Sequence, residues 1–160
     1  MSLVHIKTSY PEIAANSVFC ADLLKISPSL VDELEFLHNK NDQFFIYTAH
    51  FNGHIIGLLS LTIDLNSNIK SIPHLIVRKS TQRRGVGLYL LHQSIISFDN
   101  EYSAFKPYSW EINISRSVIG ELNKNNLSCE GLNAAYTYLV NALKNEFKSL
   151  DSLNITVISK

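Results

Sequence analysis

The sequence predicts an α/β layered domain built on a mixed sheet. Two segments with helical spacing of apolar residues precede a strong hairpin signal, and from residue 71 onward strand-like and helix-like segments alternate. The expected order is strand, two helices, three strands, helix, strand, helix, strand. Helices interspersed with strands in this way are typical of a layered sheet with helices packed against it.

The N-terminal third is expected to contain one strand and two helices. Leu3–Thr8 alternates apolar and polar residues, as a half-buried strand does. Tyr10–Lys25 has apolar residues at helical spacing and tolerates Pro11 at its start, so one continuous helix is expected there. Ser29 is positioned to cap a second helix over Leu30–His38, with two acidic residues in its first turn.

The central part of the chain predicts a hairpin. Phe44–Phe51 and His54–Leu65 read as strands, and Asn52-Gly53 between them is the strongest short-range hairpin signal.

The remaining elements are expected in alternation. Arg116–Gly131 is ambiguous between a short helix and a loop. The other segments predict strands at Ser71–Arg78, Ser109–Ser115 and Leu153–Ile158, and helices at Gly87–Phe98 and Leu132–Phe147.

The composition indicates a single globular domain over residues 1–160. Apolar residues make up 46% of the 160 positions, and the formal net charge is zero. A neutral chain of this kind is not built to coat nucleic acid or an anionic membrane. No apolar run has the length of a membrane span and no signal-peptide core is present, so a cytoplasmic protein is expected. Cys20 and Cys129 lack metal-ligand spacing, which fits reduced thiols.

The stretch Ile72–Leu91 predicts an anion-binding site. It reads as a buried strand, a basic turn with two glycines, and an amphipathic helix. Backbone N–H groups at a helix N-terminus, together with the helix dipole, attract phosphate, and glycines let it approach the backbone closely. A Walker loop is excluded because Gly87 is not followed by Lys and Ser or Thr. A dinucleotide fingerprint is excluded because Leu90 occupies the position of its third glycine.

The motif that remains resembles the pyrophosphate loop of the GNAT N-acetyltransferase superfamily, Gln/Arg-x-x-Gly-x-Gly/Ala. Gln82, Gly85 and Gly87 occupy its defining positions, and Leu75-Ile76-Val77 matches the strand pattern that precedes it. The element order also matches, so the resemblance covers most of the chain. It implies a GNAT-type mixed, mostly antiparallel central sheet with helices on both faces.

The resemblance implies acetyl-CoA (coenzyme A) as cosubstrate. In the family, backbone amides of the loop bind the phosphates and the pantetheine arm lies along the preceding strand, where a backbone N–H faces the thioester oxygen. Transferred residue by residue, the cofactor-binding positions are Leu75, Ile76, Val77, Gln82, Arg83, Arg84, Gly85, Val86, Gly87 and Leu88. The basic residues Arg78, Lys79, Arg83 and Arg84 are expected to attract the phosphates, especially the ribose 3′-phosphate; a solvated charged turn is the alternative.

Glu111 is the first candidate for a catalytic carboxylate. It lies mid-strand between Trp110 and Ile112, and burial there would raise its pKa toward neutrality. In several family members a glutamate on this strand serves as base or positions a water. The alternative is that strand alternation turns Glu111 to a solvated face while Trp110 and Ile112 point inward.

The tyrosine that serves as general acid in the family is missing from its usual place, where Asn123 stands. If Arg116–Gly131 is an insertion, the helix from Leu132 takes over the role. Asn133 would then contact the cofactor, and either Tyr136 or Tyr138 would be the acid, since residues two apart do not share a helix face. Packing is the alternative for both tyrosines.

The histidines do not predict a metal site. Phe51 is expected to pair with His54 across the hairpin, which puts His50 and His54 on opposite faces of the sheet. His74 lies on the expected cofactor strand and is a secondary candidate for proton transfer, with a structural histidine as the alternative.

The expected function is acetyl-CoA-dependent N-acetylation of a primary amine by direct attack in a ternary complex. The acceptor, whether a protein, a peptide or a small molecule, is left open, as is a homodimer. Two alternatives remain: a non-catalytic acyl-CoA-binding regulatory module, and an acyltransferase that uses a longer acyl chain.

Overall fold

The fold is an α/β layered structure, as predicted. The computed structural model describes residues 3–81, 85–114 and 155–159. Its helices are α1 (Tyr10–Ala14), α2 (Ser17–Ile26), α3 (Leu30–Lys40) and α4 (Val86–Glu101), with short 3₁₀ turns η1 (Lys79–Thr81) and η2 (Ser103–Phe105). Its strands are β1 (Val4–Thr8), β2 (Phe44–Phe51), β3 (His54–Asp64), β4 (Ile69–Val77), β5 (Ser109–Ile114) and β6 (Ile155–Ser159).

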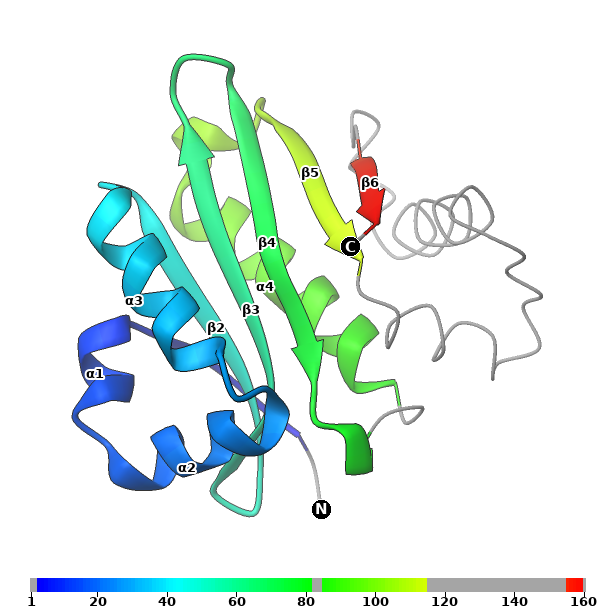
Figure 1. Cartoon of the computed structure of the whole chain (residues 1–160). Coiled ribbons are helices and arrows are strands. Elements are labelled where there is room, and N and C mark those ends of the chain that lie inside the picture. Colours follow the sequence, from blue (N-terminus) through cyan, green and yellow to red (C-terminus); the bar gives the residue numbers. More distant parts are fainter. Residues whose placement is uncertain (1–2, 82–84, 115–154, 160) are drawn as a thin grey trace.

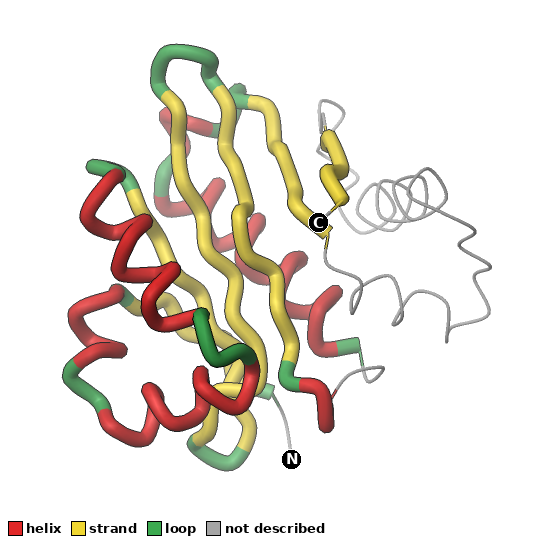
Figure 2. Tube along the Cα trace, viewed as in Figure 1, coloured by secondary structure: helices red, strands yellow, loops and turns green. Residues whose placement is uncertain are grey.

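The six strands form one sheet in the order β1-β2-β3-β4-β5-β6. The first four are antiparallel to one another, whereas β4–β5 and β5–β6 are parallel, so the sheet is mixed and mostly antiparallel. Helices α1, α2 and α3 cover one face and α4 covers the other (Figure 1). The predicted layered arrangement with helices on both faces is therefore confirmed, and Figure 2 shows the same layers by element type.

The single helix predicted over Tyr10–Lys25 is wrong. The chain leaves the helical conformation at Asn16, whose φ and ψ are −112° and 107°. The Asn16 Oδ1 accepts hydrogen bonds from the backbone N–H groups of Val18 and Phe19, at 3.0 and 3.1 Å. Asparagine thus caps a new helix, α2, because its side chain satisfies N–H groups that would otherwise have no partner.

The predicted hairpin is confirmed, together with its turn chemistry. Asn52 and Gly53 have φ values of 53° and 78°. Positive φ at both central residues matches the twist of the flanking strands, which is why Asn-Gly is favoured there.

A bulge in β4 decides which residues face which side of the sheet. Ser60 pairs with His74 and Thr62 pairs with Ser71, so Leu61 lies opposite two β4 residues, Ile72 and Pro73. Proline lacks the N–H that a regular ladder position needs, and a bulge accommodates it.

The bulge also puts Ile72 and Leu75, three positions apart, on the same face. Both pack into the core beneath α4, as does Val77. A regular strand would turn residues three apart to opposite faces. His74, in contrast, faces α3.

Helix α4 packs closely on β3 at Gly57. A Cβ added at Gly57 would lie 3.3 Å from Leu90 Cδ2 and 3.4 Å from Val86 Cγ1. The core beneath α4 also encloses an ion pair between Lys70 Nζ and Asp99 Oδ1 at 3.1 Å.

Ser29 does not cap α3 as predicted. It has helical backbone angles and its hydroxyl makes no hydrogen bond to the first-turn backbone. The Ser29 hydroxyl instead donates to Glu33 Oε1, at 3.2 Å, one turn further along. Among the described residues no helix has both the length and the apolarity that a bilayer crossing requires.

Candidate functional site

The start of α4 has the features of an anion site. Gly85 precedes the helix with φ 78°, in the left-handed region, and supplies no capping side chain. A Cβ at this position would meet nothing within 4 Å, so the requirement for glycine comes from the backbone angle rather than from crowding. The N–H groups of the following first turn, from Val86 to Leu88, point out of the helix end, where its dipole is positive.

A basic pocket lies where β4 ends, on the segment that leads toward α4. It has a volume of ≈ 500 Å³ and is lined by Lys25, Arg78, Lys79 and Ser80. Lys25 belongs to the last turn of α2, whereas the other three residues follow β4. None of the three cations forms an ion pair with a carboxylate within the described residues. The pocket therefore offers uncompensated positive charge to an anionic ligand.

The strands β4 and β5 diverge on approaching this pocket. Their parallel pairing runs from Ile69–Ser109 to Ile72–Ile112, which is where the β4 bulge lies. Beyond it β4 continues to Val77 and separates from β5 (Figure 1). Leu75, Ile76 and Val77 all belong to this diverging half, with Leu75 and Val77 turned to the α4 core and Ile76 to the opposite core.

His74 lies at the start of the diverging half and is held at both ring nitrogens. Its Nδ1 is 2.9 Å from Ser60 Oγ, and its Nε2 is 2.9 Å from Glu33 Oε2. Ser60 is fully buried, the His74 side chain is 11% exposed and that of Glu33 is 48% exposed. The three residues form a hydrogen-bond chain from the sheet interior to solvent.

Glu111 lies on the same face of the sheet as His74. Its neighbour Trp110 is buried beneath α4, in edge-to-face contact with Phe98 at 5.9 Å. Strand alternation turns Glu111 to the α3 side, where it pairs in register with Ser71 and is half-buried. Of the two orientations considered from the sequence, the one with Trp110 inward and Glu111 on the opposite face is present.

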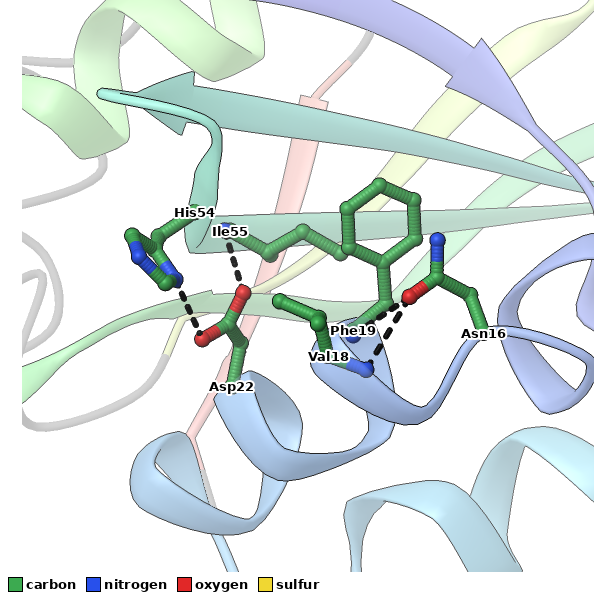
Figure 3. Close-up of polar contacts among 6 residues, drawn as sticks. All are labelled: Asn16, Val18, Phe19, Asp22, His54 and Ile55. Atoms are coloured by element: carbon green, nitrogen blue, oxygen red, sulfur yellow. Dashed lines mark hydrogen bonds and ion pairs between the residues drawn. The ribbon is translucent and has the colours of Figure 1, made fainter.

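The predicted pairing of Phe51 with His54 is confirmed. The side chains of His50 and His54 both contact residues of α2. His50 packs edge-to-face on Phe19 at 5.4 Å. His54 Nδ1 is 3.0 Å from Asp22 Oδ1, and the other oxygen of Asp22 accepts the Ile55 N–H at 3.0 Å (Figure 3). The described residues contain no group of three or more His, Cys, Asp or Glu side chains suited to a metal ion.

Several predicted site residues lie outside the described residues. They are Gln82, Arg83, Arg84, Asn133, Tyr136 and Tyr138, together with Cys129. Their proposed roles stay predictions.

Sequence reasoning missed Lys25, Glu33 and Ser60. Lys25 lies 53 positions before Arg78 and Glu33 lies 41 positions before His74, and both read as ordinary exposed helix residues. Only the packing of α2 and α3 on the face of the sheet formed by β2, β3 and β4 brings them to the site. The one signal for Glu33 in the sequence is its place in the acidic first turn of α3, where a carboxylate also complements the helix dipole.

A family model described as "Acetyltransferase (GNAT) domain, PanZ" matches residues 15–100. The match runs from the end of α1 almost to the end of α4, so it includes the bulged strand, the basic pocket and the helix N-terminus. No curated protein matches the chain.

Solved structures with a similar fold include three acetyltransferases. One is an aminoglycoside acetyltransferase from an uncultured soil metagenomic sample in complex with sisomicin, with 18% identity, a TM-score of 0.46, and coverage of 62% of this chain and 71% of that chain. A GNAT family acetyltransferase from Elizabethkingia anophelis with acetyl-CoA bound has 22% identity, a TM-score of 0.44, and coverage of 62% and 60%. The PaiA N-acetyltransferase from Thermoplasma acidophilum in complex with coenzyme A has 14% identity, a TM-score of 0.45, and coverage of 63% and 74%. Because these identities and TM-scores are low, the assignment of the chain to a family rests on the family model.

Proposed function

Because the chain belongs to the GNAT acetyltransferase family, in the class described as PanZ, we propose that it transfers an acetyl group from acetyl-CoA to a primary amine. Acetyl-CoA is the cosubstrate of this family, and the chain is an acyltransferase by membership. The nature of the acceptor and the direct attack in a ternary complex belong to the proposal.

The observation that supports the proposal most is the combination of a helix N-terminus capped by a glycine, which has no side chain to bond its N–H groups, with a basic pocket. Coenzyme A has a pyrophosphate and a 3′-phosphate, and both need positive charge or N–H donors. Gly85 and the first turn of α4 would hold the pyrophosphate, together with Gln82, Arg83 and Arg84. Arg78, Lys79 and Lys25 would hold the remaining phosphate.

In this proposal the pantetheine arm lies along Leu75–Val77, in the region where β4 and β5 diverge. The bound cosubstrate supplies an activated acetyl group as a thioester. The chain supplies orientation, because holding the amine and the thioester together makes the reaction effectively unimolecular. His74 and Glu111 on the α3 side of the sheet are candidates for handling the amine proton, and Tyr136 or Tyr138 for protonating the leaving thiolate.

The proposal is tested by titrating the full chain with acetyl-CoA in a calorimeter and then measuring thiol release with a panel of primary amines. We expect binding, amine-dependent thiol release and an acetylated product identified by mass spectrometry. Failure to bind acetyl-CoA would contradict the proposal. Binding without thiol release from any amine would favour a non-catalytic acyl-CoA-binding module.

A further inference from the structure

A carboxylate on α3 is held in a fixed orientation over the diverging half of β4. The Oε2 of Glu33 is 2.9 Å from His74 Nε2, and its Oε1 accepts a hydrogen bond from Ser29 at 3.2 Å. The other ring nitrogen of His74 is 2.9 Å from Ser60, which is fully buried. The carboxylate is thus positioned from the sheet through one imidazole and from its own helix through one hydroxyl.

The hydrogen-bond pattern assigns the tautomer of the neutral His74 ring. An ionised carboxylate only accepts hydrogen bonds, so Nε2–H must donate to Glu33 and Nδ1 must accept from the Ser60 hydroxyl. In that arrangement both ring nitrogens are engaged with these two residues. Glu33, whose side chain is 48% exposed, is therefore the proton-accepting end of the hydrogen-bond chain from Ser60 through His74. His74, whose side chain is 11% exposed, is not.

Glu111 on β5 is held less firmly than Glu33 for accepting a proton. It lies on the same face of the sheet, but the described residues supply it with no ion pair and no side-chain hydrogen bond. Without such contacts its carboxylate must lose rotamer freedom when it meets a substrate. Glu33 makes two such contacts, so less of its rotamer freedom remains to be lost when it binds a substrate, which lowers the cost of binding.

We propose that Glu33 binds the acceptor amine as its ammonium ion and receives the first of its protons, and that His74 positions the Glu33 carboxylate. This inference rests on the proposed function. It gives the acceptor class as aliphatic primary amines, which are protonated near neutrality because their pKa is about 10. Anilines, which are uncharged there, are predicted to be poor acceptors.

The proton balance of the step is complete. The ammonium nitrogen gives one proton to the Glu33 carboxylate, and its freed electron pair forms the C–N bond to the acetyl carbon. The C–S bond breaks, its electron pair leaves with the sulfur, and the thiolate gains one proton, which balances the second proton that the nitrogen loses. Glu33 returns its proton to solvent, to which it is exposed.

The main test compares Glu33→Gln with the control Glu35→Gln, which changes an exposed carboxylate two positions along α3. We expect Glu33→Gln to lower kcat/KM for aliphatic amines by about 10²-fold, the usual contribution of a positioned proton acceptor. The Kd for acetyl-CoA should stay unchanged, and the control should behave as wild type. Glu111→Gln, assayed in parallel, should have the smaller effect. Wild-type kinetics in Glu33→Gln would overturn the inference.

The positioning role of His74 is tested with His74→Gln and His74→Ala. Glutamine keeps an N–H that can donate to Glu33, so it should restore most of the kcat that alanine loses, with KM for acetyl-CoA equal in both. Equal kcat in the two variants, at matched thermal stability, would overturn the positioning role.

A binding measurement makes the outcome independent of turnover. The wild-type complex with coenzyme A is titrated with ethanolamine, spermidine and Nα-acetyl-lysine amide while the imidazole NMR signals are followed. We expect at least one amine to shift the His74 signal in the wild type and none to shift it in Glu33→Gln. If coenzyme A binds and no amine shifts His74, the inference fails and the proposed function stands. If coenzyme A does not bind, the proposed function itself fails and the inference falls with it.

Discussion

Gly85 combines a backbone requirement with a position at the proposed phosphate site. Its φ of 78° strains any residue with a Cβ, although no neighbouring atom blocks one. We expect Gly85→Val to lower the free energy of unfolding by about 1–2 kcal/mol and to raise the Kd for acetyl-CoA at least tenfold.

Gly85→Asn is the matched control, because asparagine tolerates the left-handed region better than valine does. It should recover most of the stability, measured by urea unfolding, and part of the affinity, measured by calorimetry. Unchanged affinity for acetyl-CoA in Gly85→Val would contradict the assignment of the phosphate site.

Lys70 and Asp99 form a buried ion pair with side-chain exposures of 0% and 8%. Lys70 Nζ also lies 4.1 Å from the centre of the Trp110 ring and 3.4 Å from the Lys106 carbonyl oxygen. Burial lowers the pKa of Lys70 and raises the pKa of Asp99, and the charge of each partner opposes that shift. Each charge is stabilised by the other, so removal of one member leaves the other as a buried charge without its counter-charge.

We therefore expect Asp99→Asn to destabilise the protein by about 3–5 kcal/mol, because it leaves the Lys70 ammonium without its counter-charge. The double variant Lys70→Met, Asp99→Leu should be clearly more stable than the single variant, since both charges are gone. Chemical unfolding of the three proteins checks this. A double variant as unstable as Asp99→Asn would show that the pair does not act as a unit.

At the scale of elements, the end of α2 completes the basic pocket that begins after β4. Lys25 comes from the last turn of α2, and Arg78 and Lys79 come from the segment that follows β4. We expect Lys25→Ala to raise the Kd for acetyl-CoA about fivefold at low salt, which corresponds to roughly 1 kcal/mol for one exposed charge contact.

The effect of Lys25→Ala should shrink as salt increases, because exposed charges are screened. The control is Lys40→Ala, which removes an exposed lysine from α3 that lies over the Phe36 ring. Calorimetric titrations at two salt concentrations compare the two. Equal affinities in Lys25→Ala and Lys40→Ala would remove Lys25 from the site.

At the scale of the whole molecule, two histidines, the half-buried His5 and the buried His50, couple stability to pH. His5 on β1 is hydrogen-bonded to Ser94 of α4, and His50 on β2 to Thr48. Burial lowers the pKa of both rings below the ordinary 6.5, with the charge of Asp22 partly opposing the shift for His50. Between the lowered pKa of each ring and 6.5, the unfolded chain binds more protons than the folded one.

Stability is therefore expected to be full above pH 6.5 and to fall as the pH drops through and below that value. Thermal unfolding from pH 8 to pH 5 measures this slope. His50→Gln, which removes one titrating ring, should flatten it, whereas a variant with the wild-type slope would exclude His50 from the effect.

The sequence was a good guide wherever the determining interaction is local. The Asn52-Gly53 turn and the glycine-bearing start of α4 both depend on backbone angles that a few adjacent residues fix. The local signal was overlooked at Asn16, where a capping side chain divides the expected helix in two. At Ser29 the hydroxyl could bond either the backbone or Glu33, and sequence reasoning chose the wrong partner.

The sequence by itself determined the layered fold class, the hairpin and the phosphate motif, because hydrophobic period and turn chemistry are short-range properties. Only the tertiary structure brought Lys25 to Arg78 and Glu33 to His74, because packing helices on a sheet joins residues that no local pattern relates. It also decided, through the bulge beside Pro73, which β4 side chains face α3. A one-residue shift in a strand moves every following side chain to the other face, and it depends on pairing with the neighbouring strand.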